Sequence, residues 1–299
     1  MVEQFEGQSL VQFYDRFPDD NACKEYLYHL KWQNGFQCPK CGHTACWEGP
    51  KPFYKVCKNC RHAASPTANT LFHKVKFGLR KAFIIVYEMV NSSKSLSSIQ
   101  MGKRLGIRQG TAWYFMQKVR KAMKSSQQQP LEGSVEVDEF VVGGREENKP
   151  GRSYDTRKKK AAIALELTEE RKVKRAYIRA IDDFSAKALR PLFEAHIAED
   201  AQVTTDKWTA YKSLKGEWSI EQIDSNKGLN FSELHTIIQQ VKSWIRCVPS
   251  HVSKKYFQAY LDEFCYRLNR SIFKDTIAHK TLERMALYPT ISCPLNNIT

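Results

Sequence analysis

The chain has 299 residues, of which 42% are hydrophobic and 26% charged, and its formal net charge is +15. This composition is typical of globular proteins and excludes an intrinsically disordered chain, while the length is enough for two or three folded units. The longest apolar run, residues 83–87, is too short to cross a bilayer, and the acidic residues of the opening stretch exclude a signal peptide. We therefore expect a cytoplasmic protein that has no membrane partner and keeps its thiols reduced.

Four cysteines form two Cys-x-x-Cys pairs, Cys38 with Cys41 and Cys57 with Cys60. Each pair is typical of the knuckle of a zinc ribbon, and two knuckles supply the four thiolates of one tetrahedral ion. Four unrelated buried thiols are the alternative, and Cys46 is close enough to compete as a ligand but has no partner at knuckle spacing. The pattern predicts an N-terminal helix and zinc ribbon over residues 1–72 with one structural Zn²⁺.

The positive charge is concentrated in one part of the chain. Of the 47 basic and 32 acidic residues, 16 basic and one acidic residue lie between Lys51 and Lys124, so the remainder is balanced. A solvated basic face is the alternative, but confinement to one block favours a surface for a polyanion. Because no basic amphipathic helix with aromatic residues supports a membrane surface, we expect this polyanion to be nucleic acid.

Residues 73–124 have the pattern of a helical DNA-binding region. A core-facing helix over 79–91 is followed by a capped helix over 97–105, a turn at Gly106 and a second helix over 108–121. This order predicts a helix-turn-helix, whose second helix would begin at base edges in the major groove. Helical hairpins with glycine turns also form by packing alone, and that alternative stays open. The residues expected to contact DNA are Lys103, Arg104, Arg108, Gln109 and Thr111.

The polar segment 125–130 ends in a proline and predicts a linker. The pattern then changes to strands and one helix. The predicted strands are 134–142, 161–167, 175–181 and 201–206, with a helix over 186–198. Together they predict a mixed α/β domain over 131–272, followed by a C-terminal tail, 273–299.

Two aspartates, Asp138 and Asp206, lie within or at the end of predicted strands. An acidic side chain in a strand costs free energy unless it is hydrogen-bonded or binds a cation. Capping of a strand end is the alternative for Asp206, but two such acids at the ends of neighbouring strands favour a divalent-metal site. Glu136 shares the face of Asp138 but lies earlier in the strand, and Glu139 points to the opposite face, so we do not include them in that site.

Several motifs occur in order along the chain: the two cysteine pairs, Val-Glu-Val-Asp-Glu at 135–139, Gly-Gly at 143–144, Thr-Asp at 205–206, Leu-His at 234–235 and Lys-Ser-Trp at 242–244. With the segment 260–270, they resemble bacterial insertion-sequence transposases, over residues 18–272. That group joins an N-terminal zinc ribbon to a DDE-type, ribonuclease-H-like catalytic domain. The resemblance implies that Asp138 and Asp206 bind metal, and that the enzyme cuts transposon ends and joins them to target DNA. It also implies a homo-oligomer that holds two DNA ends, in the cytoplasm at the nucleoid.

The third acid of that group is replaced here. Where the group usually has Glu seven residues before a Lys, this chain has His235 before Lys242. Seven residues are two helical turns, so both side chains lie on one face, whereas Glu233 falls on roughly the opposite face. The chain resembles a variant branch of the group that has His at this position. This resemblance implies that His235 is the third ligand or the base that orients water, and Lys242 is expected to contact a DNA phosphate. The alternative is Glu233 at a frayed helix start, with His235 packing or capping.

The expected chemistry is two-metal phosphoryl transfer. Two ions, Mg²⁺ or Mn²⁺, held by Asp138 and Asp206 would activate water against the phosphodiester at the transposon end, and the freed 3′-hydroxyl would attack target DNA. Imidazole suits Mn²⁺ better than Mg²⁺, so we expect a larger advantage of Mn²⁺ over Mg²⁺ than in a His235→Glu variant.

Two other functions stay open: a DNA-binding regulator without catalysis, and a metal-dependent nuclease that does not join strands. The basic loop 149–160 is expected either beside DNA or in solvent, and His251 and His279 are expected to be surface or packing residues.

Overall fold

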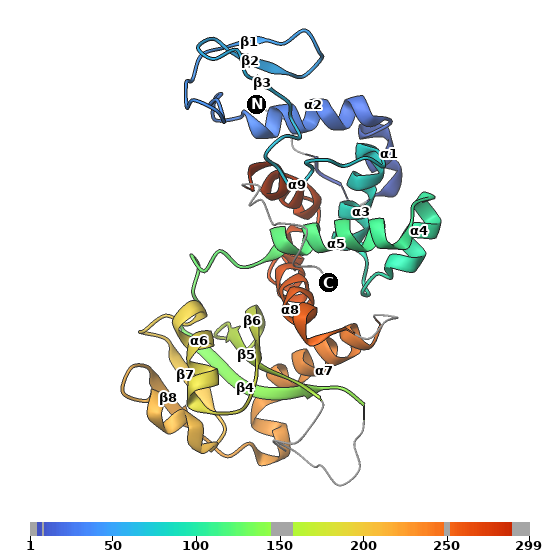
Figure 1. The fold of residues 1–299 in the computed structure, drawn as a ribbon. Coiled ribbons are helices and arrows are strands. Elements are labelled where there is room, and N and C mark those ends of the chain that lie inside the picture. Colours follow the sequence, from blue (N-terminus) through green and yellow to red (C-terminus); the bar gives the residue numbers. More distant parts are fainter. Residues whose placement is uncertain (1–4, 8, 145–157, 248–251, 289–299) are drawn as a thin grey trace. The chain divides into compact units, whose positions relative to one another are not determined.

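The computed structural model describes residues 5–7, 9–144, 158–247 and 252–288, which fall into two compact units (Figure 1). Unit 1 is Met1–Ala122 with Phe273–Thr299, and unit 2 is Met123–Ile272. The predicted fold class, a multidomain α+β protein with a zinc ribbon and a mixed α/β domain, is confirmed. Among the described residues, no helix is long and apolar enough to span a bilayer.

The ribbon of unit 1 is an antiparallel sheet of three short strands. Strand β2 (Lys55–Cys57) lies between β1 (Cys46–Glu48) and β3 (Ala63–Ala64). Its small core consists of Phe36, Cys38, Cys57 and Ala64. So few buried side chains supply little hydrophobic stabilisation, and a bound metal is the usual means by which such a module folds.

The helices of unit 1 surround a core rich in aromatic side chains. They are α1 (Leu10–Arg16), α2 (Asp20–Lys31), α3 (Leu79–Asn91), α4 (Ser98–Leu105), α5 (Gln109–Met123) and α9 (Ile277–Leu287). Phe13, Phe17, Tyr26 and Phe83 are almost fully buried and contact one another, mostly edge to face. Such pairs add about 0.5–1.5 kcal/mol each beyond the burial of their area.

Helix α9 lies in the segment 273–299, for which the sequence predicts a C-terminal tail. It packs against α2 and α3 and buries Ile277, Leu282 and Met285. The Tyr26 hydroxyl lies 2.5 Å from Nδ1 of His279, which is buried and is therefore a packing residue of unit 1. The described part of this segment thus completes a core formed at the other end of the chain, and residues 289–299 lie outside the described range.

Unit 2 is built on a five-stranded mixed sheet in the order β6-β5-β4-β7-β8. Its strands are β4 (Ser134–Val142), β5 (Lys159–Leu167), β6 (Val173–Ile181), β7 (Gln202–Thr205) and β8 (Ser219–Gln222). β4, β5 and β6 pair antiparallel, while β7 runs parallel to β4, and β8 parallel to β7. This arrangement is consistent with the ribonuclease-H-like fold that the resemblance implies.

The two faces of this sheet have separate cores. Helix α6 (Ala186–His196) covers one face, and α7 (Ser232–Arg246) and α8 (Lys254–Leu268) cover the other. In β4, Val135 and Val137 are buried on the α6 face, whereas Phe140 and Val142 are buried on the α7 face. Because side chains alternate along a strand, Asp138 points to the α7 face.

The edge strand β6 is covered by two side-chain amides, one from α8 and one from the residue just after it. The amide of Asn269, just after α8, receives the N–H of Ala176 at 2.8 Å and donates to the Ala176 carbonyl at 3.0 Å. Gln258 accepts the N–H of Ala180 at 2.7 Å and donates to the carbonyl of Ile178 at 2.9 Å. These two side chains therefore take the place of a further strand along this edge.

Candidate active site and metal centres

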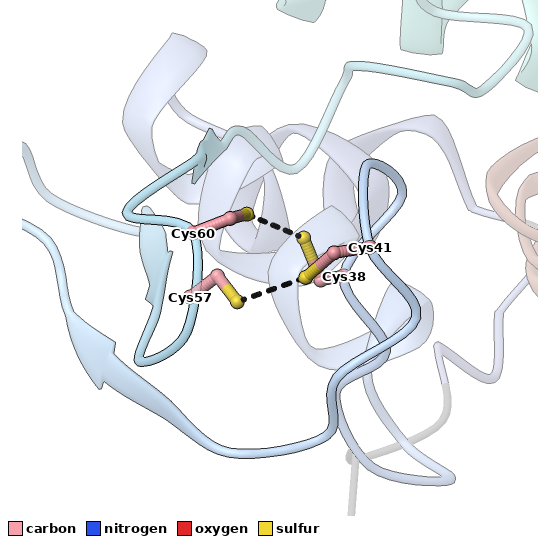
Figure 2. A group of neighbouring side chains, drawn as sticks. All are labelled: Cys38, Cys41, Cys57 and Cys60. Atoms are coloured by element: carbon pink, nitrogen blue, oxygen red, sulfur yellow. Dashed lines mark hydrogen bonds between the residues drawn. The ribbon is translucent and has the colours of Figure 1, made fainter.

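The four knuckle cysteines come together in unit 1 (Figure 2). Their Sγ atoms all lie within 4.8 Å of one another, and Cys38–Cys60 and Cys41–Cys57 are each 3.6 Å apart. Thiolates at about 2.3 Å from one tetrahedral zinc ion would lie about 3.8 Å apart, so the group fits Zn²⁺. Cys46 lies opposite Cys57 in the sheet and is not a member of this group.

An equivalent backbone hydrogen bond holds each of the two knuckles. The N–H of Cys38 donates to the His43 carbonyl at 2.9 Å, and the N–H of Cys57 donates to the His62 carbonyl at 3.0 Å. A hydrogen bond from the backbone of His43 is the main cause that lowers the pKa of Cys41 to about 6. At Cys60 the hydrogen bond from the His62 backbone also lowers the pKa, but desolvation and hydrogen bonds with the other three thiols outweigh it and raise the pKa to about 12. A lowered pKa favours the thiolate, which is the form that binds metal.

In unit 2, Asp138 and Asp206 lie next to each other across two strands. Val137 and Thr205 are the last partners in the parallel β4–β7 ladder, and Asp138 and Asp206 are the residues that directly follow them in the two segments. Both aspartates line a cavity of about 370 Å³. Asp138 Oδ1 accepts the Glu139 N–H at 2.7 Å, and Asp206 Oδ1 accepts the Trp208 N–H at 2.9 Å. These bonds orient both carboxylates before any ligand arrives.

His235 comes from the first turn of α7 and faces the same cavity. Its Nε2 lies 3.4 Å from Asp138 Oδ2, and this hydrogen bond raises the pKa of His235 against the opposing effect of partial burial. Lys242 lines the cavity two turns further along α7, with Nζ 5.9 Å from the centre of the Phe140 ring, and burial lowers its pKa. The predicted common face of His235 and Lys242 is thus the face that borders the cavity.

Glu233, the alternative to His235, has other partners. Its Oε2 accepts from Arg171 Nη2 at 3.2 Å and from the Ser232 hydroxyl at 2.6 Å. Arg171 also donates to Glu136 Oε1 at 2.7 Å, and the Glu136 side chain is only 4% exposed. Burial raises the pKa of Glu136, and Arg171 opposes that effect. Arg171 therefore joins Glu136 and Glu233 in one ionic cluster, while His235 is the residue of α7 that contacts Asp138.

Glu139 lies on the side of β4 opposite to Asp138, as its position in the strand predicts, and comes close to Tyr211. Gln239 lines the cavity one turn after His235 and was not singled out from the sequence. The signal that could have found it is its spacing of four residues from His235 along the helix.

The predicted helix-turn-helix is present as α4, a turn at Gly106 and α5. Ser97 caps α4, and Gly106 has the left-handed conformation (φ 61°, ψ 44°) in which glycine has no steric cost. Lys103 and Arg108 are exposed, and Thr111 is half-buried. Arg104 forms an ion pair with Glu88 at 2.7 Å, and the Gln109 amide donates to the Ser98 hydroxyl at 3.2 Å. Two of the five residues expected to read DNA therefore already have partners within the protein.

Most of the predicted basic loop, together with His251, lies outside the described residues. Of its described part, Lys160 is buried, and its Nζ donates to the Asp182 carbonyl at 3.2 Å. Lys160 therefore supports the sheet rather than presenting its charge to solvent.

Comparison with known proteins adds two matches. Residues 130–269 match the family model of the ISXO2-like transposase domain, and residues 18–63 match that of the transposase zinc-ribbon domain. The two regions together span more than half of the chain, and they contain the sheet of unit 2 and the cysteine group of unit 1. Among curated proteins, no match to the chain was found.

Proposed function

Because the chain belongs to the insertion-sequence transposases that combine a zinc ribbon with an ISXO2-like domain, we propose that unit 2 cuts the phosphodiester at transposon ends and joins the freed 3′-hydroxyl to target DNA. One observation carries this proposal. Asp138, Asp206 and His235, from three different elements of the chain, border one cavity, and His235 Nε2 is 3.4 Å from Asp138.

The chemical types of the donors at this cavity, two carboxylates and an imidazole, suit Mg²⁺ or Mn²⁺. Among the described residues, only the four cysteines form a group of three or more ligand side chains whose ligand atoms already lie within 4.8 Å of one another, so this proposal rests on the donor chemistry and the shared cavity. Asp138 and Asp206 would hold the metal through carboxylate oxygens, and His235 would add Nε2 as the third ligand. When bound, such ions stabilise the charge on the attacking and leaving oxygens of an in-line displacement. A set with two carboxylates and one imidazole carries one negative charge fewer than three carboxylates, and its nitrogen favours Mn²⁺.

The side chains around the cavity have separate tasks in this proposal. The backbone N–H groups of Glu139 and Trp208 keep the two carboxylates oriented, so that little reorganisation is needed during the reaction. Lys242, which lines the same cavity, would contact a DNA phosphate beside the scissile bond. If His235 acts as a base instead of a ligand, Nε2 is the atom that would hold the proton of the attacking water.

In the same proposal, unit 1 binds the DNA of the transposon ends. The excess positive charge lies between Lys51 and Lys124, which includes the second knuckle and helices α3 to α5. Binding to the terminal inverted repeats is therefore expected to weaken steeply with salt, since counterions are released from the phosphates. Bringing two transposon ends together requires at least a dimer, and the site of action is the nucleoid.

A strand-transfer assay with a labelled 3′-hydroxyl end and a plasmid target tests this function. We expect the wild-type protein to form a joined product and Asp138→Asn to lose it while binding to the end persists. Asp200→Asn, at an exposed position, is the matched control and should join normally. Cleavage without joining would identify a nuclease, and binding without cleavage by the wild-type protein would identify a regulator.

A further inference from the structure

The turn before α7 packs against the ring of His235. This turn, Asn226–Phe231, contains Lys227 (φ 54°) and Gly228 (φ 93°) in the left-handed region. A Cβ atom added at Gly228 would lie 2.4 Å from His235 Nδ1 and 2.6 Å from Cε1. Any residue other than glycine at position 228 would therefore force either the turn or the imidazole ring to move.

The turn itself is held in place on both sides. The Gly228 N–H donates to the Ser225 carbonyl at 2.8 Å, and the Asn230 side chain donates to the Asp224 carbonyl at 2.7 Å. Phe231 anchors its end in the core with 2% exposure. The ring is half-exposed and faces a cavity, so it is the ring that would yield to a larger residue.

Gly228 covers the Nδ1 side of the imidazole, while Nε2 points to Asp138. We propose that Gly228 is a positioning residue, which fixes the ring so that Nε2, and not Nδ1, is the nitrogen offered to the metal. This inference rests on the proposed function, since it assumes a metal between Asp138, Asp206 and His235. Relieving the contact would need a ring displacement of about 1 Å, which is enough to disturb metal-site geometry.

A double-mutant cycle on Mn²⁺ affinity tests this role without DNA. The four proteins are wild type, Gly228→Ala, His235→Ala and the double variant, with Mn²⁺ binding followed by electron paramagnetic resonance. We expect Gly228→Ala to weaken binding about tenfold in the wild-type background, as is typical when a residue that orients a ligand is lost. In the His235→Ala background, where there is no ring to displace, the same change should alter binding less than twofold.

The matched control is Gly133→Ala in the same unit. Gly133 also has positive φ (+64°), but a Cβ there would meet nothing within 4 Å. It therefore reports the cost of backbone strain alone, and Mn²⁺ affinity should stay within twofold of wild type.

Mn²⁺ affinity in the two backgrounds decides whether Gly228 positions the His235 ring. An equal loss of affinity in both backgrounds, or no loss in either, overturns the role of Gly228. If Gly228→Ala does not fold but the double variant does, the clash with the ring is demonstrated; if neither folds, the turn fails for its own reasons and the proposal is overturned. A cycle that shows coupling in a protein that never joins DNA would refute the proposed function and leave the role of Gly228 standing.

Discussion

Asp262 in α8 provides a quantitative test of the electrostatics of unit 2. Its carboxyl is largely buried, and burial raises its pKa from 3.8 to about 6, although the hydrogen bond from Gln258 at 2.8 Å opposes that shift. In the unfolded chain the pKa returns to its ordinary value. Because the folded-state pKa is raised, the neutral acid stabilises the fold fully below about pH 4, and this stability is lost as the pH rises through about 6.

The structure sets the size of the effect. A difference of about two pKa units corresponds to roughly 3 kcal/mol, lost between pH 4 and pH 7. Asparagine resembles the neutral acid and keeps an oxygen for the Gln258 amide. We therefore expect Asp262→Asn to be more stable than wild type by about 2–3 kcal/mol at pH 7, and equal to it within about 0.5 kcal/mol at pH 4.

Hydrogen exchange of α8 and β6 peptides measures this difference in unit 2 separately from unit 1. Wild type and variant are compared at the same pH, so that intrinsic exchange rates cancel. The control Asp200→Asn, at an exposed position, should change stability little at either pH. A stability difference between Asp262→Asn and wild type that is the same at pH 4 and pH 7 would show that the carboxyl is not held neutral by burial, and the reasoning would fail.

Three further predictions follow from the site and its surroundings. His235→Glu should reduce the advantage of Mn²⁺ over Mg²⁺ in cleavage assays, because carboxylate oxygen suits Mg²⁺ better than imidazole does. The same metal preference in both proteins would show that His235 does not bind the metal. Arg171→Ala removes the cation that pairs with the buried carboxylate of Glu136. Because the Arg171 side chain is 55% exposed and water screens the pair, thermal unfolding should show a loss of about 1–2 kcal/mol, and a loss below about 0.5 kcal/mol would contradict a stabilising pair. Cys57→Ser should abolish zinc binding, measured by elemental analysis, and destabilise the ribbon, whereas Cys46→Ser should keep one zinc ion per chain. The reverse result would show that Cys46, and not Cys57, is a zinc ligand.

The sequence predicts those features whose residue pattern lies within a single helix, strand or turn. The cysteine knuckles, the alternation of β4 and the cap and glycine turn of α4 all belong to this class. The spacing of seven residues on α7 likewise placed His235 and Lys242 on one face. Each follows from the geometry of a single element, so the prediction needs no knowledge of the rest of the fold.

Other features depend on contacts between distant segments, and the sequence carries no local sign of them. Helix α9 belongs with α2, more than 240 residues earlier, because its apolar face completes that core. Strand β8 has one apolar residue, Ile220, and is defined by its pairing with β7. Arg171, from the turn between β5 and β6, forms an ion pair with Glu233, and this contact across 62 residues has no local sign in the sequence.

The amides of Gln258 and Asn269 along β6 also bear on how two copies of the chain can associate. An incoming peptide that sought to lengthen the sheet there would first have to displace four hydrogen bonds, at a cost of about 4 kcal/mol before it gained any. The β6 edge of the sheet is thus protected against the addition of a strand from another molecule, including the non-native pairing that leads to aggregation. The proposed homo-oligomer would accordingly have to form through surfaces other than the β6 edge.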